Sequence, residues 1–417
     1  MEIRITSPTY GPDGIGRQED GKVVFVRGGV PGDSVRVSIT AEKKSHAIAE
    51  IEEILQPSPH RCPAPCPAHP ECGGCPWMHI SGQTQLDFKR EVLLSTLRDV
   101  AAEDIVGPVQ FHEGGELGYR QRARLQVEGV SGQPVQVGFF SHGTREIVPI
   151  SSCPVCRPAL SRVIEKLASL TLPWSIAGSV EFVMDDDDQV LAIVDLAKLV
   201  PDAPGLASAL LERAGLAGVA ISGPGKQRGR AGMESSSQTT QVDPHCTIPV
   251  FPGVFTQANR EVNHRLVSHV VALVSELFSR AEVVELYAGH GNFSYPLGAA
   301  EHRVLAVESG LCTEFLPRDQ RVHFMKGDAA TTLKTRLTNR KPDIVLLDPP
   351  RQGAKDAIAP LLRLKPAAIV YVSCDPNTFA RDGAMLSKRG YTLTEVTPFD
   401  MMPHTHHIEL VGLFEKL

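Results

Sequence analysis

Apolar and polar residues alternate in short runs over the first 56 residues. The runs cover residues 2–5, 22–26, 34–40 and 47–55, and turns rich in Gly and Pro separate them. Alternation with a period of two predicts strands with one buried face. Many short strands joined by tight turns favour a small β-barrel. We therefore predict a first domain, residues 1–56, that is an OB-like β-barrel.

The pattern changes after residue 56. Seven prolines fall within residues 57–79, and because each removes a backbone donor we expect no regular structure there. A helix is predicted over residues 83–100, with Leu86, Val92 and Leu97 near one stripe. Residues 117–240 indicate a mixed α/β insert, whose polar stretch 226–240 is expected to be a loop. The second predicted domain is 57–249.

One strand of this insert has an unusual charged face. Arg120, Arg122 and Arg124 occupy alternate positions and therefore share one side of the predicted strand. Three guanidiniums in a row would suit RNA phosphates, but an ordinary solvated strand face explains them equally well.

Residues 250–417 show apolar strands that alternate with helical stretches. The segment 344–347 is apolar on both faces, as a central parallel strand is. The βα repeats end in two consecutive strands and predict an α/β fold with an open, doubly wound sheet. This third predicted domain is Rossmann-like.

Composition and charge limit the function. The chain has 417 residues, 42% hydrophobic and 22% charged, with a formal charge of −6, which excludes a disordered chain and a generic basic nucleic-acid binder. No apolar run reaches about 18 residues, and the N-terminus lacks the apolar core of a signal peptide. We expect a cytoplasmic monomer without a membrane partner, in which cysteines are reduced.

A candidate nucleotide site follows the first strand of the third domain. Gly289 and Gly291 allow a tight turn near a ligand, and Glu308 lies 19 residues after Gly289, at the end of the next predicted strand. Position 294 is Ser, so the three-glycine dinucleotide pattern is absent. A smaller adenosine ligand such as S-adenosylmethionine fits better, although a glycine turn also occurs in other α/β proteins.

Two later strand ends carry candidate catalytic groups. Asp348 begins an Asp-Pro-Pro-Arg turn, and Cys374 lies between a strand and a helix that begins near Pro376. Both belong to the edge of the sheet where ligands bind. A helix N-terminus favours thiolate over thiol, so Cys374 is a candidate nucleophile. The alternative is a small, inert buried cysteine.

Four more cysteines form a candidate metal site. Cys66, Cys72 and Cys75 are spaced C-x5-C-x2-C, and Cys153 or Cys156 offers a fourth ligand. Four thiolates hold zinc or an iron–sulfur cluster equally well, and the spacing does not choose between them.

These motifs together resemble the RNA (uracil-5)-methyltransferase family, in its iron–sulfur-containing branch with an N-terminal TRAM domain. The resemblance covers nearly the whole chain and rests on 348–353 (DPPRQG), 371–376 (YVSCDP), 380–382 (ARD), 255–257 (FTQ) and the four cysteines. Asp375 departs from the family's usual Asn. Its charge disfavours a thiolate at Cys374, but its side chain can cap the helix.

The resemblance implies roles for individual residues. Cys374 becomes the nucleophile and Glu409, in the last hairpin, the base that removes the C5 proton; a solvent-facing strand residue is the alternative for Glu409. S-Adenosylmethionine contacts are implied for Gln257, Tyr287, Asn292, Glu308 and Asp348, and a [4Fe-4S] cluster for Cys66, Cys72, Cys75 and Cys153.

The expected reaction is formation of 5-methyluridine in RNA. Addition of a thiolate to C6 makes uracil C5 nucleophilic, and a base must then remove the C5 proton. Large-subunit ribosomal RNA is the expected substrate. The alternatives are transfer RNA, methylation of cytosine C5 or adenine N6, and a non-catalytic, zinc-bound RNA-binding protein.

Overall fold

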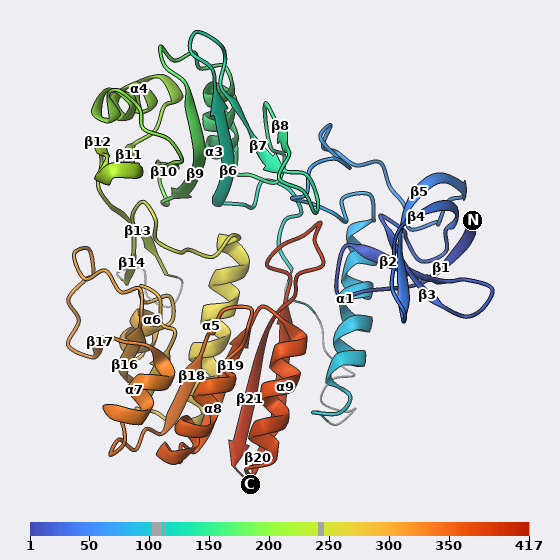
Figure 1. The fold of residues 1–417 in the computed structure, drawn as a ribbon. Helices are drawn as coiled ribbons and strands as arrows, with labels where there is room; N and C mark the ends of the chain where they lie inside the picture. The colour runs from blue at the N-terminus through green and yellow to red at the C-terminus, as the bar shows by residue number, and fades with distance from the viewer. Residues whose placement is uncertain (102–110, 112, 241–245, 417) are drawn as a thin grey trace.

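The chain forms a closed barrel, a central mixed sheet and a C-terminal open sheet (Figure 1). The structure is a computed structural model that describes residues 1–101, 111, 113–240 and 246–416. The predicted domain boundary near residue 249 lies beside residues 241–245, which are outside the described residues. No helix in the described part of the chain is long and apolar enough to cross a membrane.

The barrel has five strands, in the order β1-β2-β3-β5-β4: β1 (Glu2–Pro8), β2 (Asp13–Arg17), β3 (Val23–Arg27), β4 (Ser34–Glu42) and β5 (His46–Gln56). The alternating pattern predicted every strand except β2, whose sequence contains two glycines. They are needed because the strands pack closely: a Cβ at Gly14 would lie 2.5 Å from the carbonyl oxygen of Gly29, and one at Gly16 would overlap Ile3. Close packing therefore makes a strand from residues that favour turns.

Helix α1 (Gly82–Leu97) follows the proline-rich segment and joins the barrel side of the molecule to the C-terminal sheet. Val92, Leu93 and Leu97 are buried in the same apolar cluster as the C-terminal strands. The first half of the helix buries polar side chains instead, among them Lys89, which forms an ion pair of 2.6 Å with Asp400. The helix thus holds the 400–408 loop as well as the core.

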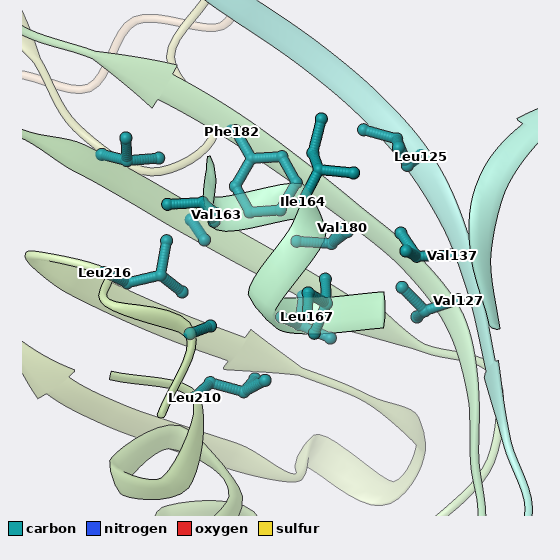
Figure 2. Close-up of a cluster of buried hydrophobic side chains, with 14 of the residues drawn as sticks. Leu125, Val127, Val137, Val163, Ile164, Leu167, Val180, Phe182, Leu210 and Leu216 are labelled. Atoms are coloured by element: carbon teal, nitrogen blue, oxygen red, sulfur yellow. The ribbon is translucent and has the colours of Figure 1, made fainter. Parts of the chain in front are cut away.

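The central sheet has seven strands in the order β12-β11-β10-β9-β6-β7-β8. Its strands are β6 (Arg122–Gly129), β7 (Gln136–Phe140), β8 (Ile147–Pro149), β9 (Ile176–Met184), β10 (Val190–Leu196), β11 (Gly218–Ser222) and β12 (Arg228–Gly232), with α3 (Pro158–Ala168), α4 (Ala203–Ala214) and the short 3-10 helix η1 (Pro224–Lys226). Figure 2 shows Val163, Ile164 and Leu167 of α3 against Leu125, Phe182 and other side chains of the sheet.

The expectation of a loop at 226–240 is wrong. Residues Arg228–Gly232 add edge strand β12, and β13 (Ser236–Thr239) pairs with β14 (Thr247–Val250). Backbone pairing with a neighbouring strand holds β12 in the sheet although its sequence is polar and contains two glycines.

The row of arginines does not form a free cationic stripe. Arg122 pairs with Glu181 at 2.9 Å, and Arg124 lies 3.7 Å from Asp195. The Arg120 side chain lies instead beside the cysteine-rich segment and donates to the sulfur of Met402. Acidic residues on the neighbouring strands therefore neutralise a face that sequence alone left open to phosphate.

The C-terminal sheet has the order β17-β16-β15-β18-β19-β21-β20, in which β21 is antiparallel to both of its neighbours, β19 and β20. Its elements are α5 (Arg260–Leu277), β15 (Glu282–Leu286), α6 (Ser294–Ala299), β16 (Arg303–Glu308), β17 (Val322–Lys326), α7 (Ala329–Thr335), β18 (Ile344–Leu347), α8 (Lys355–Leu361), η2 (Leu362–Leu364), β19 (Ala368–Ser373), α9 (Pro376–Ser387), β20 (Tyr391–Phe399) and β21 (Glu409–Lys416). This is the predicted doubly wound α/β fold.

Candidate active site and cysteine cavity

The candidate catalytic residues lie at one edge of the C-terminal sheet. Parallel pairing aligns Leu286 with Leu347 and Leu347 with Tyr371, so Tyr287, Asp348 and the segment that ends at Cys374 leave the sheet together. The parallel pairing of β15 with β16 brings the end of β16 to the same edge. The carboxyl edge of such a sheet is where ligands bind.

The glycine turn after β15 forms an open cradle. Gly289 has φ +55°, and a Cβ there would meet nothing within 4 Å. Gly291 has φ +101°, and a Cβ there would overlap the ring of Tyr295. Glu308 accepts hydrogen bonds from the backbone N–H groups of Gly289, at 3.0 Å, and Gly310, at 2.6 Å. Hydrogen bonds therefore join the acidic residue to the turn.

Tyr287 and Asn292 flank this turn in the chain, and Gln257 lies near the start of α5. Tyr287 follows β15 with φ +63°, a strained conformation for a residue with a side chain. The amide of Asn292 makes two reciprocal hydrogen bonds, of 2.9 and 3.1 Å, with that of Asn263 in α5. Gln257 lies two residues before the α5 cap, Asn259, and its carbonyl oxygen accepts from Gln121 at 3.0 Å.

A fourth acidic residue, Glu285, lies under the turn and was not assigned from sequence. It is fully buried in the middle of β15, and Ser294 donates a hydrogen bond to its Oε2. Burial, followed by the charges of Asp348 and Glu308, raises its pKa to about 8. Its Oε1 has no partner within the described residues. An acidic residue between the apolar residues Val284 and Leu286 of a central strand was the available signal.

Asp348 and Glu409 complete a group of carboxyls at this edge. Desolvation, then Glu308, raises the pKa of Asp348 to about 7. Burial and then Asp348 raise the pKa of Glu409 well above its ordinary value, although Arg351 opposes the change. A cation bound among these carboxyls would relieve their mutual repulsion and favour their ionised forms. The open cradle and the acidic lining therefore fit a cationic adenosine cofactor.

Cys374 and Glu409 face each other across two antiparallel strands. Ser373 of β19 pairs with Leu410 of β21, and one further step of this register places Cys374 opposite Glu409. Opposed Cα atoms in such a ladder are about 4.5–5.5 Å apart. The two predicted catalytic residues are therefore neighbours, although 35 residues separate them in the chain.

The charge state of Cys374 differs from the sequence expectation. Burial, followed by Glu409 and Asp348, raises the pKa of this thiol to about 12. The start of α9 was expected to favour the thiolate, but desolvation and neighbouring carboxyls outweigh the helix dipole. Asp375 does cap α9, since it accepts hydrogen bonds of 2.9 Å from Asn377 N and Thr378 N.

The turn that carries Asp348 and Arg351 is held by α9. Asp382 is fully buried and accepts from the backbone N–H of Ala354 at 2.7 Å and from the hydroxyl of Tyr371 at 2.8 Å. Arg381 donates to the carbonyl oxygen of Gln352 at 2.8 Å. These bonds fix the turn relative to the helix that begins after Cys374.

The predicted metal ligands line one cavity. Cys66, Cys72, Cys75 and Cys153 all border it, together with Arg120 and apolar side chains. Burial raises the pKa of Cys75 to about 12, and the other thiols add to the increase. Within the described residues, no three His, Cys, Asp or Glu side chains are grouped closely enough to hold a single metal ion.

The comparisons with known proteins agree with this geometry. The tRNA (uracil-5-)-methyltransferase family matches residues 236–312 and 329–417, and the TRAM domain family matches residues 1–51. The protein named 23S rRNA (uracil(1939)-C(5))-methyltransferase RlmD from Halomonas elongata is 32% identical over 439 residues, covering 99% of this chain and 89% of the relative. The protein of the same name from Shewanella sediminis is 30% identical over 411 residues, covering 95% of this chain and 92% of the relative.

The chain belongs to the RNA (uracil-5)-methyltransferase family. It is an S-adenosylmethionine-dependent methyltransferase with an N-terminal TRAM domain. The crystal structure of Pyrococcus abyssi tRNA (uracil-54, C5)-methyltransferase in complex with S-adenosyl-L-homocysteine has the same fold, with a TM-score of 0.72, 23% sequence identity and coverage of 99% of this chain and 100% of that one.

Proposed function

We propose that this methyltransferase converts a uridine of large-subunit ribosomal RNA into 5-methyluridine. The family membership supports methylation of uracil C5, and the relatives that are 30–32% identical over nearly the full length carry a 23S rRNA name. The fold neighbour that acts on tRNA is less similar, at 23% identity. We expect the enzyme to work as a monomer in the cytoplasm.

The opposed positions of Cys374 and Glu409 carry the proposed mechanism. The Cys374 thiol loses its proton to solvent, and its sulfur forms a bond with C6 of uracil, which moves the ring electrons towards C5 and O4. S-Adenosylmethionine, when bound, supplies an electrophilic methyl group to C5. Glu409 in its ionised form then removes the C5 proton, and the electrons of that C–H bond expel the sulfur from C6.

The cofactor would lie in the crevice at the sheet edge. We propose that Glu308, Tyr287, Asn292, Gln257 and Asp348 hold it, because Glu308 is bonded to the turn at Gly289, Tyr287 and Asn292 flank this turn in the chain, and Asp348 ends the neighbouring strand; for Gln257 the proposal rests on the resemblance to the family. The amide of Asn292 is already hydrogen-bonded to that of Asn263, so we expect its contact with the cofactor to be weaker than that of Glu308.

We also propose that Cys66, Cys72, Cys75 and Cys153 hold a [4Fe-4S] cluster. The four thiols line one cavity, and a cluster spans a wider space than a single ion, so its ligands stand further apart. Such a cluster would stiffen a proline-rich segment that lacks regular structure. Purified protein is expected to be brown and to contain iron and sulfide. The variant Cys66→Ser should lose its iron and sulfide, and its solubility and RNA affinity should fall before the rate of methyl transfer does. A colourless protein that contains zinc would contradict the proposal.

The reaction is tested with Glu409→Gln and Cys374→Ala. Glu409→Gln should add to C6 and methylate C5 but fail to eliminate, so a covalent RNA–protein adduct should accumulate on denaturing gels. Cys374→Ala should give neither adduct nor product, whereas Cys246→Ala, a thiol outside both sites, should behave like the wild type. Methylation by Cys374→Ala would refute the mechanism.

The RNA is tested by mapping 5-methyluridine with mass spectrometry in ribosomal and transfer RNA from cells that lack the gene. Loss from large-subunit ribosomal RNA is expected. Loss from transfer RNA alone would overturn the proposed substrate but leave the chemistry intact.

A further inference from the structure

A side chain of the N-terminal barrel reaches the backbone of the proposed nucleophile. Tyr10 lies in the turn between β1 and β2, and its hydroxyl donates a hydrogen bond of 2.9 Å to the carbonyl oxygen of Cys374, 364 residues away in the chain. The same turn is closed by Thr9, whose hydroxyl donates to the carbonyl oxygen of Asp13 at 2.6 Å. The position of Tyr10 is therefore set by the barrel and not by the catalytic sheet.

The ring of Tyr10 makes a second contact with the catalytic region. It meets the ring of His406 edge to face, with centroids 5.7 Å apart and an interplanar angle of 88°. His406 belongs to the loop that leads into Glu409, and the neighbouring His407 contacts Arg351 at 3.0 Å. Tyr10 thus touches both segments that carry the proposed nucleophile and base.

The peptide group that Tyr10 contacts controls where the thiol points. On its C-terminal side the chain is fixed, because Asp375 caps α9 and Ser373 shares hydrogen bonds with the backbone of Asp375. On its N-terminal side the β19–β21 ladder holds Ser373. The carbonyl of Cys374 lies between these two anchors, and the hydrogen bond from Tyr10 restrains the backbone dihedrals next to the Cα atom that carries the thiol.

We propose that Tyr10 is a positioning residue for Cys374: its hydroxyl orients the Cys374 peptide, so that the thiol is aligned with uracil C6 only while the barrel is seated on the catalytic domain. The inference rests on the proposed function, since it assumes that Cys374 is the nucleophile. It gives the barrel a role in the chemical step in addition to RNA binding.

The surroundings suit a neutral donor in this place. Burial, followed by the charges of Asp375, Cys374 and Glu409, raises the pKa of Tyr10, so the phenol remains a hydrogen-bond donor. Phe at position 10 would keep the ring contact with His406 and remove only the hydroxyl donor, which makes Tyr10→Phe a clean test.

The experiment compares Tyr10→Phe with Tyr391→Phe. Tyr391 also donates to a main-chain carbonyl, that of Pro366, at 2.7 Å, but at the far end of the C-terminal sheet. Both variants are mixed with an RNA transcript that contains 5-fluorouridine, in which fluorine at C5 prevents the last proton removal and traps the adduct. The rate of adduct formation is measured in single turnovers, and kcat and KM on unmodified RNA are measured separately.

Tyr10→Phe should form the adduct roughly three- to tenfold more slowly, the factor expected for one neutral hydrogen bond. Its kcat should fall in proportion, with KM for RNA, S-adenosylmethionine affinity and the unfolding midpoint unchanged. Tyr391→Phe should match the wild-type rate. Tyr10→Ala, which also loses the ring, should be slower than Tyr10→Phe.

A wild-type adduct rate in Tyr10→Phe would overturn the inference, as would a rise in KM for RNA with kcat intact, because that pattern marks an RNA contact. A wild-type enzyme that forms no adduct and no 5-methyluridine would instead overturn the proposed function itself. The two failures are therefore distinguishable.

Discussion

The buried carboxyl of Glu285 should make the stability of this protein depend on pH in a characteristic way. In Glu285→Gln the side chain keeps its shape but cannot ionise. The carboxyl is fully buried, receives one hydrogen bond from Ser294, and has a pKa of about 8. Because the folded state raises this pKa, it binds the proton more tightly than the unfolded state does.

The direction and size of the change in stability with pH follow from this difference in proton binding. Stability supplied by the protonated form is complete below the unfolded pKa, near 4.5, and is lost as the pH rises to about 8. From pH 5.5 up to the folded pKa of about 8, a span of about 2.5 pH units, the folded protein binds the proton and the unfolded chain does not. At about 1.4 kcal/mol per unit, the wild type should lose roughly 3 kcal/mol relative to Glu285→Gln.

Urea unfolding at pH 5.5, 7 and 9 measures this loss. The absolute stability of Glu285→Gln is expected to be lower at pH 5.5, since its amide leaves a donor without a partner, at a cost of about 1–3 kcal/mol. The difference between variant and wild type should nevertheless move by roughly 3 kcal/mol in favour of the variant by pH 9. Glu282→Gln, at the exposed end of the same strand, should run parallel to the wild type. Parallel profiles for Glu285→Gln would refute the reasoning.

Substitutions at the Lys89–Asp400 pair and at the two glycines of the cradle test the supports of the site. Lys89→Met removes one partner of a buried ion pair whose side chains are 0% and 6% exposed. It should lower the free energy of unfolding by roughly 3–5 kcal/mol, because Asp400 is left without its partner, and the double variant Lys89→Met/Asp400→Asn should recover much of this loss in urea unfolding. A loss below about 1 kcal/mol in the single variant would contradict the argument. Gly291→Ala should weaken S-adenosylmethionine binding by about tenfold or more in calorimetry, because its φ is +101° and a Cβ would overlap Tyr295. Gly289→Ala should also weaken binding, because its Cβ would enter the open space that we assign to the cofactor; unchanged binding in Gly289→Ala would show that the cradle is misassigned.

Local patterns in the sequence were sufficient for the C-terminal sheet. Strand 344–347 is apolar on both faces, and this composition is explained only by burial between two helical layers. Gly289 and Glu308 were paired by spacing, and the structure joins them by a hydrogen bond of 3.0 Å. The barrel strand β2 was missed because its glycines favour turns by themselves and form a strand only under close packing with Ile3 and Gly29.

The sequence determined the order of the strands, the side chains at their ends and hence the chemistry that the chain can perform, because these follow from periodicity and from residue type. Only the tertiary structure decided the charges. Burial and the carboxyls of Glu409 and Asp348 raise the pKa of the Cys374 thiol, and Glu181 and Asp195 form ion pairs with the arginines of β6. Tyr10 and Cys374 likewise meet although 364 residues separate them. Electrostatic energy depends on distance in space and on burial, and neither quantity is a local property of the chain.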